Sequence, residues 1–206
     1  MGRRADPCNH EAVAVTLSRD LVVETARRQL ERDGATELSL RAVARELGVT
    51  APALYAYVDD KGELMAAVAA EHFERLIERI ETVDEDDPLE RVRAVSRAYV
   101  DHALESPGLF RLMFNYPPST AGEVDAFPPA ARAVEVASRA MTAARDQGLL
   151  RSDDVDTACM VMWAAMHGVA EILLMDFGFD SEAAESLITS AIDTMLIGLV
   201  AYDRRW

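Results

Sequence analysis

The residues best suited to contact another molecule lie in one short stretch, Ser39 to Val58. Apolar side chains at helical spacing predict a short helix, and Gly48 follows its last apolar residue, where a helix commonly ends. Thr50 can cap a second helix by accepting a backbone N–H, and Pro52 suits its first turn. We expect Leu54 and Val58 to turn inward. Small or uncharged side chains then cover the outer surface: Thr50, Ala51, Ala53, Tyr55 and Tyr57. Such a helix fits a DNA major groove, which is the helix-turn-helix plan.

A second set of candidate residues is apolar and aromatic, and it centres on a helix expected over residues 154–177. This segment is apolar almost all round, which indicates burial on several sides. Its methionines suit either an adaptable ligand pocket or an ordinary helical core. His167 and Glu171 are four residues apart, so they either orient a polar group of a ligand or satisfy each other at a subunit contact. The candidate ligand-binding residues are Phe110, Met113, Phe114, Met141, Met162, Trp163, Met166, His167 and Glu171.

The sequence gives little support to catalysis, a cofactor or a bound metal. No nucleophile-elbow motif occurs, and the histidines at 10, 72, 102 and 167 lack the spacing of a zinc site. The acidic run at residues 84–87 lacks the alternating ligands and central glycine of a calcium loop. We therefore expect a protein that is not an enzyme, unless the fold alone assembles a catalytic site.

Composition predicts a soluble, all-helical protein. Half of the 206 residues are hydrophobic, glycine and proline number only ten and eight, and no segment alternates apolar and polar residues for long. The apolar run from Ala158 to Ala170 is shorter than the roughly 20 residues of a membrane span. Cys8 and Cys159 are far apart and suit unpaired thiols, and Met1 to Thr16 lacks the apolar core of a signal peptide. These features predict a cytoplasmic location.

The net charge of −15 weighs against a nucleic-acid-binding protein, but it is unevenly distributed. Residues 1–60 contain eight basic and ten acidic side chains, whereas residues 61–206 contain thirteen and twenty-six. The N-terminal part is therefore nearly neutral, and it has arginines available for phosphates.

Helical periodicity and turn residues predict nine helices in three regions. We expect a flexible arm over residues 1–17, a three-helix head with the helix-turn-helix over 18–62, and a six-helix bundle for ligand binding and dimerisation over 63–206. Small residues such as Gly168 and Gly198 lie on long apolar faces of the last two helices. Two such helices and their symmetry mates predict a four-helix dimer seam.

The chain resembles the tetracycline-repressor (TetR/AcrR) family of bacterial regulators. The resemblance rests on L-S-L-R-A-V-A-R-E-L-G-V-T-A-P-A-L-Y, which ends at Tyr55, and on D-K-G-E-L at residues 60–64. More weakly, S-P-G-L-F-R-L-M-F at 106–114 and W-x3-H-G at 163–168 resemble the Trp-His-Gly subtype of the C-terminal domain. The resemblance implies a homodimer, a palindromic double-stranded DNA operator, and an effector pocket in the body that controls the spacing of the two heads.

The resemblance also implies that Lys61, at a helix N-terminus, contacts a phosphate. Two departures from the family pattern bear on DNA binding: Asp59 and Asp60 precede Lys61, and Tyr57 stands where a histidine is common. The aspartates add repulsion, so we expect modest and salt-dependent affinity. Phosphate contacts are expected from Arg41, Thr50, Tyr55 and Lys61, and contacts with base edges from Ala51, Pro52, Ala53 and Tyr57.

Two alternatives stay open at the level of single residues. Tyr55 can instead be a core tyrosine that bonds locally, and Arg19 and Arg45 fit surface charges better than contacts. For the whole chain, the expectation is a dimeric repressor released from its operator by a small, largely apolar effector. The alternative is a helical ligand-binding protein or enzyme whose head no longer binds DNA.

Overall fold

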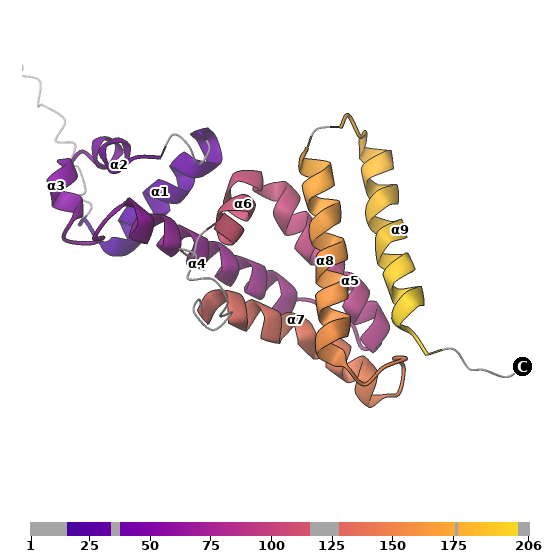
Figure 1. Cartoon of the computed structure of the whole chain (residues 1–206). Helices are drawn as coiled ribbons and strands as arrows, with labels where there is room; N and C mark the ends of the chain where they lie inside the picture. The colour runs from indigo at the N-terminus through magenta and orange to yellow at the C-terminus, as the bar shows by residue number, and fades with distance from the viewer. Residues whose placement is uncertain (1–15, 34–37, 116–127, 176, 202–206) are drawn as a thin grey trace, which may run out of the picture.

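Nine α-helices make up the part of the chain that this computed structural model describes, residues 16–33, 38–115, 128–175 and 177–201 (Figure 1). They are α1 (Arg19–Asp33), α2 (Leu40–Glu46), α3 (Ala51–Leu54), α4 (Lys61–Glu81), α5 (Pro88–Glu105), α6 (Pro107–Asn115), α7 (Pro128–Asp146), α8 (Val155–Leu174) and α9 (Ser181–Leu199). The predicted all-helical class is confirmed. Most of the predicted N-terminal arm, Cys8 and His10 included, lies outside the described residues, as does the predicted helix stop at Gly34.

The helices enclose two hydrophobic cores that share α4 and α6. The head core unites α1, α2 and α3 with residues 64–69 of α4, and the body core unites residues 73–80 of α4 with α5 and α7 to α9. On α6, Leu109 packs into the head core and Phe110 into the body core. Figure 1 shows α4 running from the head into the body. A displacement of α4 or α6 therefore affects both cores.

Serine side chains cap the first two helices of the head. The Ser18 hydroxyl accepts the N–H of Leu21 at 3.2 Å and begins α1, and Ser39 accepts the N–H of Ala42 at 3.2 Å and begins α2. On the inner face of α1, Val22 and Leu30 are buried in the head core. Capping and an apolar stripe together fix where α1 begins and which face it buries.

The last two helices, α8 and α9, end earlier than the sequence predicts. The chain was expected to stay helical to Phe177 and to Tyr202, but α8 ends at Leu174 and α9 at Leu199. After α9, Val200 is extended and forms an isolated antiparallel bridge with Leu150. The bridge uses backbone groups that a longer α9 would have paired within the helix, so it ends the helix.

The length argument against a membrane span does not hold for α8. Its 20 residues, with a mean hydropathy of 1.5, make it long and apolar enough to cross a membrane by length and composition. It is the one such helix among the described residues. However, α8 contacts α5, α7 and α9 and contributes Met162 and Met166 to the body core. Packing within the bundle accounts for its apolar composition.

Candidate nucleic-acid interface and effector site

The turn between α2 and α3 is a Schellman motif. The N–H of Gly48 donates to the carbonyl of Arg45 at 3.2 Å, and the N–H of Val49 donates to the carbonyl of Ala44 at 2.9 Å. Gly48 has a φ of 69°, a left-handed conformation that glycine adopts without penalty. The glycine therefore sets the direction in which α3 leaves α2.

Helix α3 is a single turn, shorter than the helix expected to reach Val58. Leu54 and Val58 are buried in the head core, as predicted. Thr50 is the N-cap, but its side chain forms no capping hydrogen bond, so that prediction is wrong; the Thr50 carbonyl instead accepts the N–H of Ala53 at 2.9 Å. The Thr50 side chain is exposed on the surface next to Pro52.

The two tyrosines that follow α3 have different environments. Tyr55 is 56 % exposed, which does not fit a core tyrosine. Tyr57 is half-buried against the head core, and its hydroxyl donates to the backbone carbonyl of Leu17 at 3.1 Å. Local bonding was considered for Tyr55, but the structure assigns it to Tyr57. The Tyr57 hydroxyl therefore ties this surface to the segment that precedes α1.

Basic side chains of the described head fall into two groups. Those of α1 are paired: Arg19 with Glu63 at 3.2 Å, Arg27 and Arg28 with Glu24, and Arg32 with Glu46. Within residues 16–33 and 38–70, the cations without an ion-pair partner among the described residues are Arg41, Arg45 and Lys61, and all three are exposed. Cations that pair with no carboxylate of the described residues are available to phosphates.

Asp60 and Glu63 cap the start of α4. The Asp60 carboxylate accepts the N–H of Glu63 at 2.8 Å. The Glu63 carboxylate accepts the N–H of Asp59 rather than that of Asp60, and it also pairs with Arg19. These two contacts hold the pKa of Glu63 below its usual value. The Asp60 carboxylate is thus used by the helix, and Lys61 remains exposed beside it.

An aromatic cluster forms around His167 in the body. The indole N–H of Trp163 donates to the hydroxyl oxygen of Tyr99 at 3.1 Å, and that hydroxyl lies 2.9 Å from Nδ1 of His167. Ring centroids of Phe110 and Phe114 lie 5.4 and 4.7 Å from that of His167. Tyr99, on α5, was not among the predicted residues, because only tertiary packing brings it to α8.

The predicted ligand-binding residues divide between the core and its edge. Buried in the body core are Phe110, Met113, Met141, Met162 and Met166. At the edge, Phe114 and Trp163 are 39 % and 41 % exposed, and His167 and Glu171 are half-buried. His167 bonds to Tyr99, and Glu171 pairs with Arg111 at 3.6 Å. Each of these two side chains therefore has a partner other than the one suggested by their spacing.

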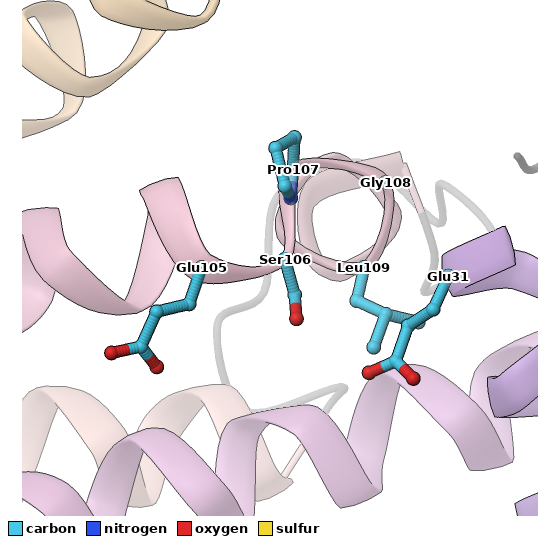
Figure 2. Close-up of a pocket in the computed structure, with 6 residues that line it drawn as sticks. All are labelled: Glu31, Glu105, Ser106, Pro107, Gly108 and Leu109. Atoms are coloured by element: carbon cyan, nitrogen blue, oxygen red, sulfur yellow. The ribbon is translucent and has the colours of Figure 1, made fainter.

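A hollow of about 230 Å³ lies at the junction of head and body (Figure 2). Glu31 of α1 and the α5–α6 junction from Glu105 to Leu109 line it, and in Figure 2 the side chains of Glu105 and Glu31 lie on opposite sides of Ser106. Both carboxylates already have partners, since Glu31 accepts from Arg27 at 2.6 Å and Glu105 from Arg79. No cluster of metal-ligating side chains occurs in the parts of the chain that the structure describes. This hollow is separate from the predicted effector residues.

Exposed apolar side chains lie along α8, and α9, its neighbour in Figure 1, exposes Ile197 and Gly198; we refer to these residues together as the stripe. Its large side chains are 40–60 % exposed, and Ala164 and Gly168 lie between them at helical spacing. The stripe comprises Met160, Val161, Ala164, Gly168, Ile172, Met175, Ile197 and Gly198. Ile192 and Leu196, which were expected at a dimer seam, are buried in the body core of their own chain instead.

Comparison with known proteins agrees with this geometry. Residues 22–68 match the model of the bacterial regulatory proteins of the tetR family, and residues 92–195 match the tetracyclin repressor-like C-terminal domain. The chain belongs to the tetracycline-repressor family. Members of this family are transcriptional regulators with a helix-turn-helix head and a ligand-binding body, and they are not enzymes.

Among its relatives is the HTH-type transcriptional regulator Rv1816 of Mycobacterium tuberculosis, 27 % identical over 87 % of this chain and 91 % of that protein. A Rhodococcus sp. RHA1 protein of unknown function is 28 % identical, with a TM-score of 0.78 over 93 % of this chain and all of that one. RolR, solved with resorcinol, shares the fold at 20 % identity, with a TM-score of 0.66 over 89 % of this chain and 88 % of that chain.

Proposed function

We propose that this regulator is a repressor that binds a palindromic operator as a homodimer and is released by a small, largely apolar effector. The observation that carries the proposal is the separation of charge in the head. The α1 arginines are used in ion pairs, whereas the exposed Arg41 and Lys61 have no partner among the described residues, and in the sequence one precedes the α3 turn and the other follows it. This arrangement presents cations to two phosphate strands with small side chains between them.

The proposed contacts with DNA follow from this arrangement. Arg41, Thr50, Tyr55 and Lys61 would contact phosphates and set the register of the head on the duplex. Ala51, Pro52 and Ala53 would lie against base edges. Tyr57 would contact bases through its ring alone, since its hydroxyl is bonded to Leu17.

The proposed dimer is formed by α8 and α9. A monomer would leave the exposed stripe of these helices in water, and stripes of this kind mark contact surfaces. A second copy related by two-fold symmetry would cover it with the same stripe. Because α4 and α6 belong to both cores, an effector that shifts the body core would also shift the heads. The effector then favours a dimer whose heads do not match the half-site spacing.

The finer divisions of the chain are part of the same proposal. Residues 18–62 would bind DNA, and residues 63–206 would bind ligand and form the dimer. Trp163, His167 and Gly168 support the Trp-His-Gly subtype for the body. A DNA-binding regulator of this kind would work in the cytoplasm.

In vitro selection from random duplexes tests the proposed operator. We expect enrichment of an inverted repeat whose half-sites are one helical turn or a multiple of it apart. A Thr50→Ala, Tyr55→Ala variant should enrich nothing, and a Val134→Ala variant, changed at an exposed α7 position, should enrich the same repeat as the unaltered protein. Enrichment of nothing by the unaltered protein at low salt would favour a ligand-binding protein without DNA affinity.

A further inference from the structure

The hydrogen bonds around Tyr99 form a chain whose direction can be worked out. An indole N–H only donates, so the Tyr99 oxygen accepts from Trp163 at 3.1 Å. The Tyr99 hydroxyl has one proton, and its other contact is Nδ1 of His167 at 2.9 Å. Only the state of His167 decides which of these two groups donates in the second bond.

One of the two arrangements leaves a buried donor unsatisfied. If Nδ1 carried a proton, it would donate to the Tyr99 oxygen, and the Tyr99 proton would have no acceptor among the described residues. Tyr99 is only 8 % exposed, so water does not readily replace the missing acceptor. We therefore assign Tyr99 as the donor, a neutral His167, and a ring proton on Nε2. Burial raises the pKa of Tyr99, which keeps this hydroxyl protonated.

The Nε2 edge of His167 is an available donor. It forms no hydrogen bond with any residue in the described ranges, and it is not among the buried atoms that lack a partner, so it reaches solvent. Flat apolar surfaces stand beside it: the ring centroids of Phe114 and Trp163 lie 4.7 and 5.4 Å from that of His167, and both side chains are partly exposed. Glu171, one turn further along α8, is paired with Arg111 of α6.

We propose that the effector is an uncharged, flat molecule with a carbonyl-type acceptor, which accepts the Nε2–H of His167 and stacks on Trp163 and Phe114. This inference rests on the proposed function, because it assigns the ligand class of the effector site. A neutral His167 offers a single donor and no charge, so an uncharged acceptor matches it without an unpaired ion. Tyr99 is a positioning residue, since it fixes the tautomer without touching the ligand.

Nuclear magnetic resonance tests the tautomer directly. Long-range ¹H–¹⁵N spectra of the full chain at pH 7.5 should show His167 with its proton on Nε2. In Tyr99→Phe, which keeps the ring and removes the hydroxyl, the two tautomers should be mixed. A proton on Nδ1 in the unaltered protein, or an unchanged His167 spectrum in Tyr99→Phe, would overturn the assignment. Assignment of the signals is checked by the loss of one set in His167→Phe.

A matched pair of probes tests the ligand class. Isothermal titration with 2-acetylnaphthalene and 2-isopropenylnaphthalene compares a carbonyl with a methylene group in molecules of nearly the same shape. We expect the ketone to bind about tenfold tighter, a preference that shrinks in Tyr99→Phe and disappears in His167→Phe. Equal affinities, or no binding of the ketone at 1 mM, would overturn the proposed ligand class.

Measuring DNA binding separately distinguishes this inference from the proposed function. Ketone preference in a protein that enriches no DNA would support the ligand class and overturn the repressor. Enrichment of an inverted repeat without ketone preference would support the repressor and overturn the proposed ligand class.

Discussion

His72 of α4 stacks on His102 of α5. On α4, His72 lies between the residues that pack in the head core and those that pack in the body core. Their ring centroids are 4.1 Å apart with an interplanar angle of 28°, and the side chains are 3 % and 5 % exposed. Both ring nitrogens of His72 and Nε2 of His102 have no hydrogen-bond partner in the described structure. Arg27, Arg75 and Arg79 lie close enough to disfavour further positive charge, and Glu105 opposes them.

This pair predicts that stability falls as the pH falls from neutral. Burial, and to a lesser extent the nearby His102, lowers the pKa of His72 to about 3. Burial, and to a lesser extent the charge of Arg79, lowers the pKa of His102 to about 4. As the pH falls below 6.5, the two histidines take up protons in the unfolded chain but stay neutral in the folded chain. The free energy of unfolding therefore falls from its value above pH 6.5 until the pH reaches the folded pKa values, about 3 and about 4. We expect a loss of about 2 kcal/mol per ring by pH 4.5.

Urea denaturation between pH 7.5 and 4.5 measures this loss. A His72→Phe, His102→Phe variant keeps the stack and removes the titration, so its stability should change much less over the same range. Carboxylates such as Glu24 and Glu105, whose pKa values are lowered by their arginine partners, also contribute to stability. That contribution is lost only as the pH falls below the usual carboxylate pKa, so it changes little between pH 7.5 and 4.5. Equal pH dependence of the variant and the unaltered protein would show that other groups are responsible.

The proposed dimer predicts opposite effects of one substitution on the monomer and on the assembly. A Cβ at Gly168 meets nothing within 4 Å in the single chain, so Gly168→Ala should leave the monomer as stable or more stable, by up to about 1 kcal/mol. At a tightly packed seam, the extra methyl should raise the dimer dissociation constant about tenfold.

Sedimentation equilibrium checks this prediction. Ile172→Glu should give monomers, because it places a charge in the stripe. Val134→Glu, at a position that is 54 % exposed on α7, is the matched control and should remain dimeric. A dimer that tolerates Ile172→Glu as well as Val134→Glu would place the seam elsewhere.

Replacing Gly48 should lower stability through the backbone conformation alone, without any steric clash. No atom lies within 4 Å of a Cβ built at this position, but the φ of 69° disfavours any side chain. Gly48→Ala should therefore cost about 1 kcal/mol of unfolding free energy, and Gly48→Asn should cost less, because asparagine tolerates this conformation. Thermal denaturation compares the two. If asparagine were as costly as alanine, the backbone explanation would fail.

Removing the hydroxyl of Tyr57 should affect stability, whereas removing that of Tyr55 should affect DNA binding. Tyr57→Phe removes the bond to Leu17 and should cost about 1 kcal/mol of stability while leaving sequence preference for DNA nearly unchanged. Tyr55→Phe should leave stability unchanged and weaken DNA binding several-fold through a lost phosphate contact. Calorimetry and DNA titration of both variants separate the two roles. The same outcome in both variants would contradict this assignment.

Local signals explain how much of the fold could be predicted from the sequence. Ser18, Ser39 and Asp60 each bond to a backbone N–H three residues further along, so the starts of α1, α2 and α4 follow from residue type. The end of α9 could not be predicted in this way. It depends on Val200 pairing with Leu150, fifty positions earlier in the chain, which no local pattern encodes.

The candidate sites show the same limit. The spacing of His167 and Glu171 indicates correctly that they share a face of α8, but spacing cannot reveal that Tyr99 and Arg111 are their partners. Likewise, residue type alone does not distinguish Arg41 from Arg27. Only the folded head shows that Arg27 lies between Glu24 and Glu31, whereas Arg41 has no described partner.

Fluorescence anisotropy on a duplex from the gene's upstream region tests the central claim most directly. Lys61→Ala should weaken binding at least tenfold and reduce the salt slope by about two, because a dimer loses two phosphate contacts. Arg132→Ala, which removes a body arginine paired with Glu74, is the matched control and should bind as the unaltered protein does. Equal affinity of the two variants would contradict the proposed phosphate contact of Lys61, and no binding by the unaltered protein at low salt would contradict a DNA-binding role for this head.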